Sequence, residues 1–194
     1  MDKRTLLVGV ASFLLIAAVA VGTILFSRSA SFNGTTYGKP YPSAPEIVLT
    51  RDNGIGFRLS EMRGKVVLVF FGYTNCPDEC PLTMAKLKQT FDLLGAQSAD
   101  AQVLFVTTDP VRDGPDVLKR FTGQFNPAFI GLSGSLEEMQ KVWGDYGVLV
   151  EDAGATHSNR VYVIDRNGML RLTFSYDMEP DAMASDVEKL LSEK

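Results

Sequence analysis

Histidine and cysteine are nearly absent from this chain. Its 194 residues include one histidine, His157, and two cysteines, Cys76 and Cys80. A site that needs an imidazole or a thiolate, whether for a transition metal or for nucleophilic catalysis, therefore has only these three candidates. Structural zinc is disfavoured because it usually takes four Cys or His ligands and only three are present.

A basic surface is also lacking. The chain has 19 Lys and Arg residues against 23 Asp and Glu residues, a formal net charge of −4, and its basic residues form no stripe along the sequence. Nucleic-acid binding is disfavoured, because it depends on a concentrated positive field. The sequence contains no internal repeat and no low-complexity tract, and its length suits one domain with a substantial core.

One long apolar run stands at the N-terminus. Residues 6–26, LLVGVASFLLIAAVAVGTILF, carry no charge, and about 20 such residues cross a bilayer as a helix. A cleaved signal peptide usually has a shorter apolar region of roughly 7–15 residues, so we expect an uncleaved signal anchor. Lys3 and Arg4 precede the run, and this positive charge places residues 1–5 in the cytoplasm and the rest of the chain outside it.

The remainder of the chain is expected to lie in the periplasm or an equivalent compartment. Residues 27–43, with their many small and polar side chains, are interpreted as a tether, and residues 44–194 as one folded domain. In such a compartment a thiol pair can be oxidised to a disulfide or kept reduced by a dedicated reductant.

Strands alternate with helices from Ala44 onward, which predicts an α/β domain with a central mixed sheet. The order is that of a thioredoxin-like fold with an N-terminal hairpin extension. The expected strands are Glu46–Leu49, Phe57–Leu59, Lys65–Phe71, Val103–Thr107, Phe129–Leu132, Val161–Ile164 and Leu170–Phe174. The expected helices are Leu82–Leu94, Pro115–Phe125, one that follows the Ser135-x-x-Glu138 capping box to Tyr146, and Pro180–Leu191.

The two cysteines lie between a buried strand and an amphipathic helix, in the sequence GYTNCPDECP. We expect Cys76 at the helix start, with Pro77 in the first helical position, where its missing N–H costs nothing. Residues four apart share a helix face, so the sulfurs of Cys76 and Cys80 can point at one spot. The helix N-terminus favours the thiolate form that both metal binding and thiol exchange require.

Several roles remain open for this pair on residue chemistry alone. A soft ion such as Cu(I) accepts two thiolates and a third ligand, whereas a thiol pair can also exchange disulfides. The cysteines could be core filler or a structural bridge, although a bridge over three residues restrains little chain. His157 is the only imidazole for a third ligand, and it precedes a strand that enters near the cysteine helix in a thioredoxin-like fold; a solvated histidine is the alternative.

At these residues the sequence resembles the SCO/SenC family of copper-binding, thioredoxin-like assembly factors for cytochrome c oxidase. The resemblance extends from about Pro45 to Leu191 and includes segments 70–81, 107–121, 129–135 and 157–168. It implies that Cys76, Cys80 and His157 are ligands of copper, as Cu(I), Cu(II) or both. It further implies a metallochaperone that supplies or matures the dinuclear copper centre of oxidase subunit II, or another copper-receiving client.

The chain departs from the family pattern at one position. Many members place an acidic residue directly before the ligand histidine, and this chain has Thr156. The alternative function is an envelope thiol–disulfide reductase in which Cys76 attacks and Cys80 resolves, and a peroxidase-like enzyme is a third hypothesis. The acidic segment 109–113 is interpreted as either lining the site or forming a solvated loop before a helix.

Overall fold

The computed structural model describes residues 31–151, 155–156 and 159–193. The chain divides into a unit Met1–Phe32, of which only Ser31 and Phe32 are described, and a unit Asn33–Lys194. Within the described residues, no helix is both long enough and apolar enough to cross a membrane. The signal anchor expected at residues 6–26 lies outside them.

The second unit is built on one mixed sheet of eight strands in the order β1-β10-β9-β4-β5-β6-β2-β3. β4, β5 and β6 pair in parallel, and the other neighbours pair antiparallel. β2 and β3 form the expected N-terminal hairpin. The strands are β1 (Thr35–Thr36), β2 (Val48–Arg51), β3 (Gly56–Arg58), β4 (Val66–Gly72), β5 (Ala101–Thr107), β6 (Ile130–Ser133), β9 (Arg160–Ile164) and β10 (Leu170–Ser175).

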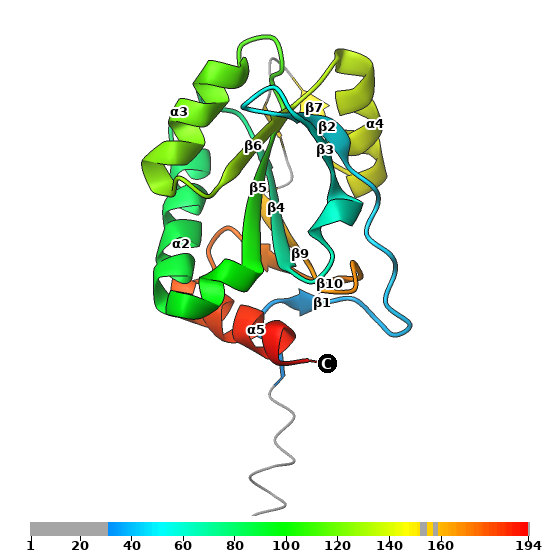
Figure 1. Ribbon diagram of the computed structural model, residues 1–194, viewed down its shortest axis with the longest axis vertical. Helices are drawn as coiled ribbons and strands as arrows, with labels where there is room; N and C mark the ends of the chain where they lie inside the picture. The colour runs from blue at the N-terminus through cyan, green and yellow to red at the C-terminus, as the bar shows by residue number, and fades with distance from the viewer. Residues whose placement is uncertain (1–30, 152–154, 157–158, 194) are drawn as a thin grey trace, which may run out of the picture. The chain divides into compact units, whose positions relative to one another are not determined.

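Helices cover both faces of this sheet (Figure 1). All seven residues of β4 are buried, as expected of a central strand with a layer on each side. Val67, Val69 and Phe71 pack in one cluster with the buried side chains of α4 (Leu136–Tyr146). The opposite face is covered by α2 (Glu79–Leu94), α3 (Pro115–Phe125) and α5 (Pro180–Ser192), and 3₁₀ turns occupy Leu59–Met62 and Gly95–Asp100.

Each strand and helix expected from the pattern is present, with bounds shifted by up to three residues. Two features were not expected. A two-stranded hairpin, β7 (Val150–Glu151) with β8 (Ala155–Thr156), precedes β9, and β1 lies inside the segment interpreted as a tether. Two-residue strands are too short to produce a period in the sequence, so pattern analysis does not detect them.

Part of the expected tether, residues 27–43, is folded onto the sheet. Thr35 pairs with Thr173 of β10, and Ser43 forms a bridge with Met169. The carboxylate of Asp186 on α5, which is fully buried, accepts hydrogen bonds from the backbone N–H groups of Asn33 and Gly34, each at 2.8 Å. The sheet unit therefore begins near residue 33.

The capping box at the start of α4 is present as the sequence predicts. Ser135 Oγ accepts from the backbone N–H of Glu138, and the Glu138 carboxylate accepts from the Ser135 N–H at 2.8 Å. We expect Ser135→Ala to lower the free energy of unfolding by about 1 kcal/mol, because the helix loses a donor–acceptor pair at its first turn. Urea unfolding measures this loss. Gln140→Ala, an exposed change in the same helix, is the control, and equal stability of Ser135→Ala and the wild type would contradict the prediction.

Candidate metal centre

The cysteine motif follows the end of a buried parallel strand. β4 ends at Gly72, which pairs with Thr107 at the end of β5, so both chains leave the sheet at the same edge. The backbone N–H of Thr108 donates to the carbonyl of Gly72 at 2.7 Å. This hydrogen bond links the two chain segments where they leave the sheet. Residues 73–78 then form an irregular loop before α2 begins at Glu79.

The expectation that Cys76 starts the helix is wrong. The helix begins three residues later, and Cys76 lies in the loop, where its own N–H donates to the carbonyl of Tyr73. The prolines do not decide this start, because proline is tolerated at the first helical position and elsewhere in the first turn. Pro81 falls in the first turn, where a missing N–H is tolerated.

The two sulfurs nevertheless lie close together, as the spacing predicts. The backbone N–H of Cys80 points at Cys76 Sγ, with a nitrogen–sulfur distance of 3.5 Å. Both cysteines are free thiols. Cys76 thus uses its sulfur in the way that a capping side chain uses its oxygen, as an acceptor for an unpaired N–H in the first turn of the helix.

Cys76 is surrounded by donors. Partial burial acts to raise the pKa of its thiol, but the backbone N–H groups of Asp78 and Cys80 and the side chains of Cys80 and Tyr73 donate to the sulfur. These hydrogen bonds stabilise the thiolate and lower the pKa below its ordinary value. Half-buried Cys76 is therefore the more nucleophilic of the two sulfurs.

Cys80 has the opposite environment. It is 4% exposed on the first turn of α2, and burial raises the pKa of its thiol despite a hydrogen bond from the backbone N–H of Tyr73. The sulfur packs on Gly72, where a Cβ atom would lie only 2.8 Å from it. Cys80 is thus held rigidly between strand and helix, and glycine is required at residue 72 to leave it room.

A buried carboxylate of segment 109–113, which the sequence left open between lining the site and forming a solvated loop, supports the cysteine loop. Asp113 is fully buried and accepts from the Thr74 N–H at 3.0 Å, the Thr74 hydroxyl at 2.5 Å and the Thr107 hydroxyl at 2.6 Å. Asp109, 6% exposed, forms an ion pair with Arg112. The interpretation of segment 109–113 as a solvated loop is therefore wrong for these two aspartates. The sequence alone could not distinguish these two buried aspartates from solvated ones, because only their burial in the fold sets them apart.

His157 lies outside the described residues, so the structure does not test it as a ligand. Within the described part of the chain, no group of three or more His, Cys, Asp or Glu residues is placed to hold a metal. The residues next to His157 that the structure describes lie near β4 and the start of α2. Thr156 ends β8, which lies beside β4, and the Asn159 side chain donates to the carboxylate of Glu79 at the start of α2.

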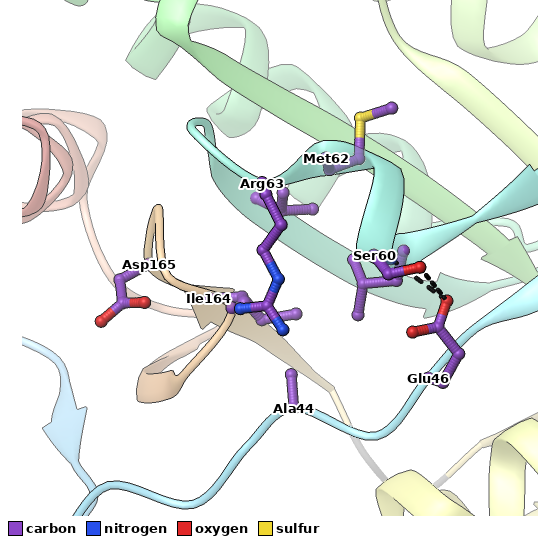
Figure 2. A pocket seen from close by; sticks show the side chains of 10 residues that line it. Ala44, Glu46, Ser60, Met62, Arg63, Ile164 and Asp165 are labelled. Carbon is purple, nitrogen blue, oxygen red and sulfur yellow. Dashed lines mark hydrogen bonds between the residues drawn. The ribbon is translucent and has the colours of Figure 1, made fainter.

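A separate pocket lies toward the other end of β4 (Figure 2). Its lining includes Val67, close to the first residue of β4, and Arg63, whose side chain is directed toward Ala44 in the close-up. Glu46 accepts there from the N–H and hydroxyl of Ser60. Neither Cys76 nor Cys80 lines this pocket.

The sheet order, the helices on both faces and a thiol pair between a buried strand and α2 define a thioredoxin-like domain with a reactive cysteine site. The SCO1/SenC family profile matches residues 37–192. The chain belongs to this family, which confirms the resemblance drawn from its motifs.

Solved and curated relatives agree with this assignment. The SCO2-like protein of Rickettsia felis is 33% identical over 144 residues, 70% of each chain. The structure of Bradyrhizobium japonicum ScoI with copper bound is 30% identical, with a TM-score of 0.71 over 77% of this chain and 99% of that one. The solution structures of apo Sco1 from Thermus thermophilus are 35% identical, with a TM-score of 0.72 over 83% and 98% of the two chains.

The asymmetry of the two thiols predicts selective alkylation. The pKa of Cys76 is lowered, so its thiolate forms at lower pH, whereas the pKa of Cys80 is raised and its sulfur is buried. We expect iodoacetamide at pH 8 to modify Cys76 of the reduced protein at least about tenfold faster than Cys80. Peptide mass spectrometry over time measures both rates. Cys76→Ser is the control, since its remaining thiol should react slowly, and equal rates in the wild type would contradict the prediction.

Proposed function

We propose that this protein is a membrane-anchored copper metallochaperone. In this proposal, the folded unit that begins near residue 33 is the copper-binding domain, with Cys76, Cys80 and His157 holding one copper ion as cargo. The ion is supplied to the dinuclear copper centre of cytochrome c oxidase subunit II or to another copper-receiving client. The observation that carries the proposal is the paired, unoxidised sulfurs at the exit of β4 in a chain of the SCO1/SenC family.

The donor set suits a soft metal. Two thiolates and one imidazole are ligands that Cu(I) accepts, and three ligands are enough for it. The N–H and hydroxyl groups that surround Cys76 favour its charged form, in which sulfur binds metal. A relative of the same fold, Bradyrhizobium japonicum ScoI, has been solved with copper bound.

The surroundings of His157 support it as the third ligand. Asn159 contacts Glu79, the residue that precedes Cys80, so the chain two positions after His157 lies at the cysteine helix. Cα atoms two residues apart are separated by at most about 7 Å. An imidazole carried on this short span is within range of a site at the start of α2.

Copper binding tests the proposal directly. We expect the reduced domain to bind about one copper per chain, and expect Cys76→Ala, Cys80→Ala and His157→Ala each to weaken binding at least about tenfold, since each removes a ligand. Titration of Cu(I) against a competing chelator measures the affinities. Asn167→Ala, in the turn between β9 and β10, leaves the proposed ligands intact and is the control. A reduced wild-type domain that binds no copper would overturn the proposal.

The alternative, a thiol–disulfide reductase, is favoured by the unequal thiols. The Cys76 thiolate would attack a client disulfide and release one client thiolate, and Cys80 would then attack the mixed disulfide and release the other. The client gains two electrons and the Cys76–Cys80 pair is oxidised. His157→Ala separates the two functions, because it should weaken copper binding and leave the rate of disulfide reduction unchanged. Loss of both activities together would argue against an independent reductase.

The proposed location depends on the N-terminal segment. Residues 1–5 are assigned to the cytoplasm, 6–26 to a transmembrane signal anchor and 27–32 to the connection with the folded unit, which faces the periplasm or an equivalent space. We expect the full chain to remain in the membrane fraction after an alkaline carbonate wash, and a chain that begins at residue 33 to be recovered as soluble protein. Sedimentation followed by immunoblotting measures this. Release of the full chain by the wash would contradict the anchor.

A further inference from the structure

The cysteine loop is fixed by a carboxylate that belongs to neither the loop nor the helix. Residues 73–78 pair with no strand, and Cys76 makes one local backbone bond, to Tyr73. The loop is attached to the domain through Thr74, whose N–H and hydroxyl both donate to Asp113, at 3.0 and 2.5 Å.

Asp113 is itself held in place from the sheet. Its second oxygen also accepts from the hydroxyl of Thr107, the last residue of β5, at 2.6 Å. The Thr107 hydroxyl in turn accepts a hydrogen bond from the N–H of Asp109 at 2.9 Å. This hydroxyl therefore both donates and accepts a hydrogen bond. The Thr107 carbonyl accepts from Trp143 Nε1 of α4 at 3.1 Å. A buried network thus connects both layers of the domain to the cysteine loop.

The two sulfurs depend differently on this network. Cys80 is held mainly by α2 and by its packing on Gly72, and the loop adds one hydrogen bond to its sulfur, from the Tyr73 N–H. Cys76 lies two residues after Thr74, outside the helix, and its place opposite the Cys80 N–H follows from how the loop is attached. The distance between the two sulfurs therefore depends mainly on where the loop holds Cys76.

We infer that Asp113 is a positioning residue that holds Cys76 at the separation from Cys80 that a bound metal requires. The inference rests on the proposed copper site, although its first test needs no metal. Asp113 touches neither sulfur; it acts through Thr74. Side chains that orient metal ligands from outside the ligand set commonly change metal affinity by about 10- to 100-fold when removed.

The test compares Asp113→Ala with a matched variant, Asp186→Ala. Both aspartates are fully buried and accept backbone N–H bonds, but those of Asp186 come from Asn33 and Gly34 at the N-terminal edge of the unit. In the reduced, metal-free protein we expect Asp113→Ala to lose hydrogen-exchange protection at the Thr74 amide, and Asp186→Ala to keep it. We also expect copper binding to weaken about tenfold in Asp113→Ala and less than about threefold in Asp186→Ala.

Two milder variants keep the test informative if Asp113→Ala fails to fold. Asp113→Asn retains one oxygen to accept from the Thr74 N–H and the Thr107 hydroxyl, so it should bind copper within about threefold of the wild type. Thr74→Val removes the hydroxyl bond alone and should weaken binding to an intermediate extent. The same visible absorption band for Cu(II)–thiolate in wild type and Asp113→Asn, with a shifted band in Thr74→Val, would support positioning over charge.

Three results would overturn the inference: wild-type copper affinity and absorption in both Asp113→Ala and Thr74→Val, equal weakening in Asp186→Ala, or unchanged protection of the Thr74 amide in Asp113→Ala. Failure of the proposed function is distinguishable from these. It would appear as a wild-type domain that binds no copper, whereas the exchange measurement on the metal-free protein would still report whether Asp113 holds the loop.

Discussion

The parallel pairing of β4 with β5 is the constraint on which the site depends. It places Gly72 opposite Thr107, so the cysteine loop and the segment that carries Asp113 leave the sheet side by side. Parallel strands need a long crossover between them, and that crossover here is α2, the helix that carries Cys80. One register therefore fixes the loop, the helix and the carboxylate relative to one another.

The two thiols of this site differ because they lie in different parts of the strand–loop–helix junction. Cys76 lies in the loop, where N–H and hydroxyl donors gather around its sulfur, whereas Cys80 enters the first turn of the helix and packs on Gly72. The chemical inequality that metal transfer and thiol exchange can both use thus follows from where α2 begins.

Much of the fold could be predicted because its signals are local. The apolar run of β4 and the Ser135 capping box each determine an element within a few residues, and the scarcity of Cys and His left few site candidates. What could not be predicted depends on distant parts of the chain. Asp113 is defined by burial beside Thr74, 39 residues away, and β1 exists only because β10 pairs with it. The start of α2 was misplaced because either proline of the motif could stand in the first turn of a helix.

The unequal burial of the sulfurs also has a consequence for the order of ligand exchange. If the two sulfurs held a metal ion, an incoming ligand would reach it more easily on the side of half-buried Cys76, because Cys80 is enclosed by β4 and α2. Ligand substitution at such an ion would then be directional, with the bond to Cys76 open to an acceptor before the bond to Cys80.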